Sequence, residues 1–93
     1  MSIALLSTNQ PRLARRVRLE WDPVRERHVL LEPEGVLVLN QTGATILGLC
    51  DGERTVAEIA EDLRGRYNRV VEDEVRDFLS RLVAKRLVEP GDE

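Results

Sequence analysis

The first apolar positions of the chain that form a regular pattern alternate with charged ones. In residues 15–21, Val17, Leu19 and Trp21 fall on one face of an extended segment, and charged side chains fall on the other. This period of two predicts a half-buried β-strand. The strand ends just after Trp21, where an Asp-Pro pair follows, because proline cannot donate to a sheet ladder.

Two further short apolar runs follow, at residues 28–32 and 36–39. A Pro-Glu-Gly turn at residues 33–35 separates them. Because the turns are so closely spaced, these segments predict a three-stranded antiparallel meander together with the first strand.

From Asn40 onwards the pattern becomes helical. Asn40 is placed to cap a first helix, because its side-chain oxygen can accept from a free N–H of the first turn. We expect this helix to end at Asp51-Gly52, since glycine is the usual helix terminator. Thr55 and Glu58 have the spacing of a capping box, which predicts that a second helix begins there.

A third helix is predicted over residues 71–83, where apolar residues recur at helical spacing. Its apolar stripe consists of Val71, Val75, Phe78, Leu79, Leu82 and Val83. Leu87 and Val88 then predict a last short strand. The fold class expected from these elements is α+β: a winged-helix-like domain with a three-stranded antiparallel sheet followed by three helices.

Composition limits the chain to one small domain. With 93 residues, 42% hydrophobic and 33% charged, it has the material for a single core. We expect a flexible N-terminal arm at residues 1–14, one domain at residues 15–88 and a polar tail at residues 89–93. No apolar run approaches the ~20 residues that span a bilayer, and no secretory signal pattern is visible, so we expect a cytoplasmic protein without a membrane partner.

The residues needed for covalent chemistry are scarce. The chain has one histidine, His28, and one cysteine, Cys50. Cys50 falls at the end of a predicted helix, whose negative dipole disfavours a thiolate and raises the thiol pKa. A structural zinc site needs four ligands. We therefore expect Cys50 to be a buried, inert thiol, and we expect no catalytic residue, no metal, no cofactor and no enzyme activity.

The helix-turn-helix order makes DNA binding an alternative. However, the helix that would enter the groove begins with Glu72, Asp73 and Glu74, and the net charge is -3. Carboxylates at that position would repel a phosphate backbone, so we expect no nucleic-acid partner. The arginines near the first strand suit either phosphate or an acidic peptide; they are Arg12, Arg15, Arg16, Arg18, Arg25 and Arg27.

Several short motifs of the chain resemble the PqqD family, small accessory proteins of pyrroloquinoline quinone (PQQ) biosynthesis. The similarity covers nearly the whole of residues 13–88. It is carried by residues 30–35, 39–40, 46–47 and 49–52, and by Thr55-Val56 and Glu58-Ile59. Relatives with this fold are recognition elements for ribosomally made, post-translationally modified peptides (RiPPs).

The resemblance implies a peptide chaperone. Family members bind the precursor peptide PqqA and present it to PqqE, a radical-SAM enzyme. The peptide adds as a further strand beside the third strand, against the third helix. Strand residues implied here are Val36, Leu37, Val38 and Leu39; helix residues implied are Val75, Arg76, Leu79 and Leu82.

Three alternatives stay open at this stage. One is recognition of the leader peptide of another modified-peptide pathway, and the second, less favoured, is DNA binding as a winged helix. Self-association is the third: the apolar N-terminal residues or an open sheet edge could pair two copies into a homodimer. Short apolar edge strands without charges are suited to pairing with another chain.

Overall fold

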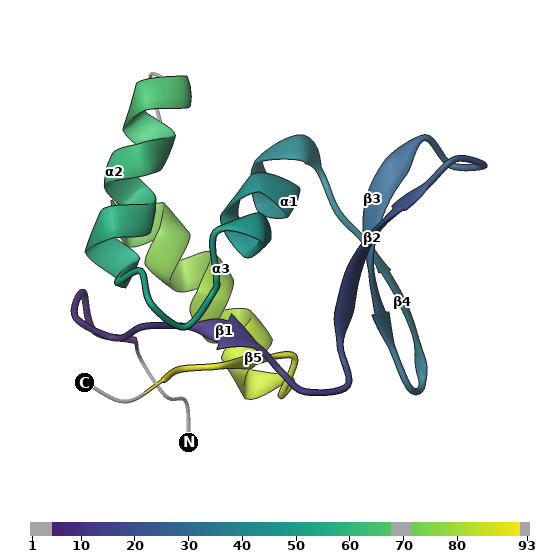
Figure 1. The fold of residues 1–93 in the computed structure, drawn as a ribbon, viewed down its shortest axis with the longest axis horizontal. Helices are drawn as coiled ribbons and strands as arrows, with labels where there is room; N and C mark the ends of the chain where they lie inside the picture. Colours follow the sequence, from purple (N-terminus) through teal and green to yellow (C-terminus); the bar gives the residue numbers. More distant parts are fainter. Residues whose placement is uncertain (1–4, 68–71, 92–93) are drawn as a thin grey trace.

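A computed structural model of the protein describes residues 5–67 and 72–91. A three-stranded antiparallel sheet forms one side of the molecule and three helices form the other (Figure 1). The sheet consists of β2 (Arg18–Asp22), β3 (Arg27–Glu32) and β4 (Gly35–Val38), in the order β2-β3-β4. The predicted meander and the order of sheet and helices are confirmed, whereas the likeness to a winged helix stays a prediction.

Local capping signals set the starts of the first two helices. The Asn40 side chain accepts a hydrogen bond from the Gly43 N–H at the start of α1 (Gln41–Gly48). Thr55 and Glu58 form the predicted capping box at the start of α2 (Val56–Arg66). Both predictions are confirmed, because such caps depend on residues only three positions apart.

The first helix ends earlier than predicted. Its C-cap is Leu49, whose backbone N–H bonds to the carbonyls of Ile46 and Leu47. Asp51 instead folds a turn with its side chain, accepting from the backbone N–H groups of Glu53 and Arg54. Asp51-Gly52 is therefore a turn between the helices and not the end of α1, a correction to the sequence prediction.

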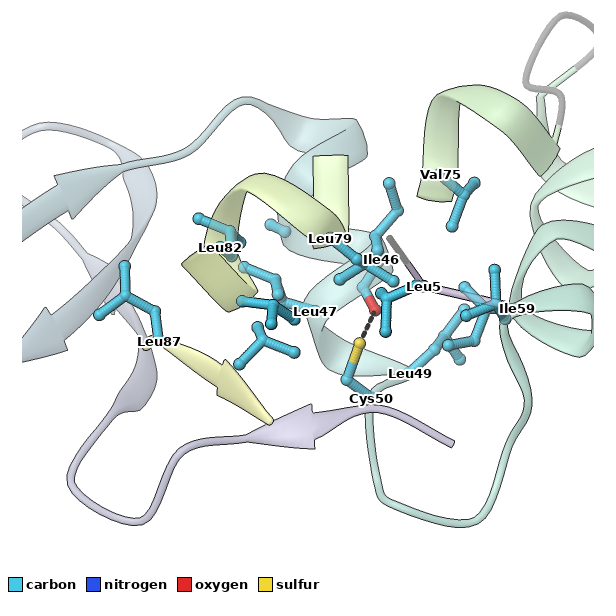
Figure 2. Packing of buried hydrophobic residues seen from close by; sticks show 14 of the residues in the cluster. Leu5, Ile46, Leu47, Leu49, Cys50, Ile59, Val75, Leu79, Leu82 and Leu87 are labelled. Atoms are coloured by element: carbon cyan, nitrogen blue, oxygen red, sulfur yellow. Dashed lines mark hydrogen bonds between the residues drawn. The ribbon is translucent and has the colours of Figure 1, made fainter. Parts of the chain in front are cut away.

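The third helix, α3, runs over Glu72–Ala84 and supplies the centre of the core (Figure 2). Four residues of its predicted apolar stripe are buried: Val75, Leu79, Leu82 and Val83. Val71 lies outside the described residues. The core lies between the three helices and is closed from the sheet side by Leu30 and Leu39, and α1 is the helix that packs against β2 and β3.

The described part of the N-terminal segment is packed onto the domain. Leu5 is 1% exposed, and the carbonyls of Ser7 and Asn9 accept from the Ala57 and Val56 N–H groups at the start of α2. The flexibility of residues 1–14 stays a prediction, but residues 5–9 lie against the domain. The reason is that the free N–H groups of a helix start need acceptors, and this segment supplies them.

Two short strands join the ends of the domain. β1 (Arg12–Leu13) pairs antiparallel with β5 (Val88–Glu89), which follows α3. The predicted last strand is confirmed, although its partner β1 was not foreseen. Glu89, where the polar tail is predicted to begin, belongs to this strand, and the tail itself stays a prediction.

Candidate functional site

β4 lies at an edge of its sheet, and in the described residues it pairs only with β3. Leu37 faces Leu30 in the register, and the Leu39 N–H donates to the His28 carbonyl at 3.0 Å. Antiparallel pairs alternate between hydrogen-bonded and non-hydrogen-bonded positions. It follows that Leu37 and Leu39 direct their backbone groups at β3, whereas Val36 and Val38 direct theirs outwards.

The side chains of this edge are uncharged and half open to solvent. Val36 is 49% exposed and Val38 43% exposed. Leu37, on the opposite face, is half-buried against the core, and Leu39 is buried. The outward backbone groups thus belong to the two residues with accessible apolar side chains, an arrangement suited to an added strand.

The helix residues predicted for the same site are mostly inside the core. Leu79 and Leu82 are buried, as Figure 2 illustrates, and so have almost no surface for a ligand to contact. Arg76 is half-buried and already paired, with Asp73 at 2.6 Å and Glu72 at 3.6 Å. The structure does not join these three side chains to the open edge, and their part in binding stays a prediction.

Val75 lies in the wall of a hollow, although its side chain is as buried as that of Leu79. A hollow of about 320 Å³ lies between α1 and α3, and it is lined by Asn40, Thr42, Gly43, Ile46, Glu74, Val75 and Phe78. Asn40 is two residues beyond the end of β4, so the hollow begins near the point where the open strand ends.

Gly43, on α1, allows the Phe78 ring of α3 to approach α1 closely. A Cβ at this position would lie 3.1 Å from Phe78 Cζ and 3.0 Å from the capping oxygen of Asn40. Sequence reasoning recognised Asn40 as a cap but not Gly43 or Phe78 as parts of a candidate site. The only available signal was a glycine in the first turn of a helix, where it weakens helix formation unless packing requires it.

The two residues with potentially reactive side chains, Cys50 and His28, contact neighbouring residues of the fold. Cys50 is buried, and its thiol donates to the Ile46 carbonyl (Figure 2). Burial, and then the nearby Asp51 charge, raise the pKa of Cys50 to about 12. The expected raised pKa and buried thiol are confirmed, although burial and not the helix end is the main cause. His28 is exposed and lies edge-on to Trp21, with ring centroids 5.1 Å apart.

Neither a metal site nor a membrane helix emerges from the described residues. Within residues 5–67 and 72–91, no three His, Cys, Asp or Glu side chains gather to hold a metal ion. In the same part of the chain, none of the helices has the length and apolar character needed to cross a bilayer. The β4 edge offers outward backbone groups and accessible apolar side chains.

Known proteins resemble this chain over most of its length. The model of the family "Coenzyme PQQ synthesis protein D (PqqD)" matches residues 27–88. A PqqA binding protein of Azotobacter vinelandii is 44% identical over 71 residues, covering 74% of this chain and 77% of that protein. A PqqA binding protein of Stutzerimonas stutzeri is 37% identical over 84 residues, covering 88% of this chain and 91% of that protein.

Two solved structures share the fold. One is the solution NMR structure of the PqqD truncation of Methylobacterium extorquens PqqCD, described as a stand-alone RiPP recognition element. It superimposes with a TM-score of 0.79 at 38% identity, covering 92% of this chain and 95% of that one. The other is the heterocyclase TruD, with a TM-score of 0.63 at 29% identity, covering 86% of this chain and 11% of that one.

Proposed function

The chain belongs to the PqqD family of coenzyme PQQ synthesis proteins, and we propose that it binds the precursor peptide PqqA as an additional strand on β4. Two relatives that align with this chain over most of their own length are PqqA binding proteins. The single observation that carries the proposal is the open edge of β4, where Val36 and Val38 combine outward backbone groups with exposed side chains.

The edge offers an added strand up to four backbone hydrogen bonds, two from each valine. Each contributes ~0.5–1.5 kcal/mol net, and the valine side chains bury further apolar surface when a strand covers them. A short segment held by so few hydrogen bonds binds reversibly. Such reversibility suits a chaperone that passes its peptide on.

The α3 side of the site consists of Val75, Arg76, Leu79 and Leu82. Val75 lines the hollow beyond β4, which gives a peptide side chain a place to enter. Arg76 exchanges its Glu72 and Asp73 partners for a carboxylate of the peptide. Leu79 and Leu82 lie in the core and do not contact the peptide unless α3 shifts.

The bound peptide is then presented to the radical-SAM enzyme PqqE, and the protein itself performs no catalysis. A recognition domain for a different modified peptide is the second candidate, because the heterocyclase TruD contains a similar fold. Both candidates use the same edge and differ in the peptide. We expect neither a nucleic-acid partner nor a cofactor, and a cytoplasmic location stays a prediction.

Calorimetric titration with synthetic PqqA tests this function. Val38→Pro removes one outward N–H from β4 without removing a bond to β3, a change that edge strands tolerate. We expect the wild type to bind, and we expect Val38→Pro to bind at least about tenfold more weakly, the equivalent of ~1.4 kcal/mol. Val38→Thr, which keeps the N–H and the shape, is the matched control and should retain most of the affinity.

Two results would reject the proposal. One is wild-type protein that gives no heat with PqqA, either alone or with PqqE present. The other is unchanged affinity in the Val38→Pro variant when circular dichroism shows it folded. The handover itself is tested by sedimentation. PqqA should sediment together with PqqE when this protein is included, and not when it is omitted.

A further inference from the structure

Two basic turns lie next to each other on the side of the molecule where β1 leads into β2. Arg15 and Arg16 occupy the centre of the first turn, which the Val17 N–H closes onto the Ala14 carbonyl at 3.0 Å. Lys85 and Arg86 occupy the turn that follows α3.

A backbone hydrogen bond fixes the two turns to each other. The Ala14 N–H donates to the Leu87 carbonyl at 3.0 Å, continuing the contact between β1 and β5. Residues about 70 positions apart therefore present four cationic side chains from one rigid corner, and the sequence alone gave no sign of this.

The turns surround a hollow of about 310 Å³. Its apolar lining residues are Ala14, Val17, Pro33 and Leu87, and its charged ones are Arg15, Arg16, Glu32, Lys85 and Arg86. Four cations against one carboxylate give this corner a charge of +3, while the whole chain carries -3. The positive charge is thus concentrated around an apolar floor.

These four cations lack the carboxylate partners that most other arginines of the described residues have; Arg27 and Arg81 are the other two without an ion pair there. Seven other arginines form ion pairs within the described residues, namely Arg12, Arg18, Arg25, Arg54, Arg64, Arg66 and Arg76. In the same described part of the chain, none of the four cations at the hollow forms one. A cluster of four like charges that faces a single carboxylate, Glu32, favours an acidic ligand.

The backbone at Arg86 adds a second, independent observation. The N–H groups of Arg86 and Leu87 bond to the carbonyls of Val83 and Leu82, the pattern of a Schellman helix end. Arg86 occupies its left-handed position with φ 63°, where glycine is usual and other residues are strained. The chain therefore places a cation at a position where glycine would fit with less strain.

We propose that this corner is a docking surface for an acidic segment of a partner protein, separate from β4. Carboxylates of the segment pair with the four cations, and an apolar side chain between them covers the accessible apolar lining at Ala14 and Pro33, below which Val17 and Leu87 are buried. The apolar floor and Glu32 favour a protein segment over a phosphate backbone, which presents no apolar group to such a floor. The proposal holds whichever peptide β4 binds.

A labelled synthetic peptide rich in glutamate and leucine tests this docking by fluorescence anisotropy. The control peptide has glutamine in place of every glutamate. We expect the acidic peptide alone to bind, and added salt to weaken it. The test variant is Arg86→Gly, which removes a cation and relieves the left-handed strain. It should be at least as stable as the wild type, yet bind about two- to fivefold more weakly.

Further variants keep the test decisive. Arg16→Ser together with Arg86→Gly should weaken binding further, whereas Arg64→Ser, which removes an arginine paired with Glu61 on α2, should leave it unchanged. Four results would overturn the proposal: no binding of the acidic peptide at low salt, equal binding of the glutamine peptide, tighter binding of duplex DNA, or a loss caused by Val38→Pro but not by the Arg86→Gly variants.

Discussion

The β2-β3-β4 sheet has two edges, and they are protected differently. By the alternation that places Leu37 towards β3, the outward backbone groups of β2 belong to Leu19 and Trp21. On either side of Leu19, β2 carries Arg18 and Glu20, both exposed and 3.5 Å apart at their charged atoms. The opposite edge, β4, has no charged residue at all.

Charged side chains on an edge strand discourage pairing with other chains, because a second strand would have to desolvate or repel them. β2 follows this rule and β4 does not. Since both edges belong to one small sheet, the difference favours β4 over β2 as the edge for a partner strand. This reasoning supports the proposed peptide site independently of the family to which the chain belongs.

Proline substitution distinguishes the β4 residues that bond to β3 from those whose N–H groups point outwards. It should give the largest change in stability of the variants considered. Leu37→Pro removes a ladder bond to β3 and should destabilise the protein by on the order of 3 kcal/mol, the scale of a misplaced proline. Val38→Pro removes only an outward N–H and should leave the free energy of unfolding within ~1 kcal/mol of the wild type. Urea denaturation measures both, and equal losses would contradict the assigned alternation.

Protection can be transferred from one edge to the other. Val38→Lys gives β4 the kind of charge that β2 has, so PqqA binding should weaken about tenfold, or ~1.4 kcal/mol. Calorimetry would measure the affinity, with Val24→Lys as control, since Val24 is 90% exposed in the turn between β2 and β3. If both lysine variants bind PqqA equally well, the edge does not carry the binding.

Removing protection from β2 is the converse experiment and should have the smallest effect on stability. Replacing Arg18 and Glu20 by threonine breaks an exposed ion pair, worth ~0–1 kcal/mol. The variant should nevertheless self-associate at concentrations where the wild type does not. Sedimentation over a dilution series measures this, and a monomeric variant would mean that something other than charge protects β2.

What the sequence predicted well was local. The Asn40 cap, the capping box at Thr55 and the meander each depend on residues a few positions apart, and all are present. The end of α1 was misjudged because the Asp51 side chain forms a turn with the next N–H groups, a competition that residue preferences do not resolve.

Contacts between residues far apart in the chain were not predicted from the sequence. The pairing of β1 with β5 joins residues at opposite ends of the chain, and no period reveals it in strands two residues long. For the candidate site, the open strand was recognised from its apolar residues, but helical spacing alone could not separate the α3 residues that fill the core from those at a surface. Leu79 and Leu82, which were predicted for the peptide site, are buried in the core.

Amide hydrogen exchange, read residue by residue by NMR with and without PqqA, tests the central claim most directly. In the free protein, the Val36 and Val38 amides should exchange rapidly, whereas the Leu37 and Leu39 amides should be protected by β3. Saturating peptide should then protect Val36 and Val38 and leave Leu19 and Trp21 unchanged. Protection of Leu19 and Trp21 instead, with Val36 and Val38 still exchanging freely, would contradict the account.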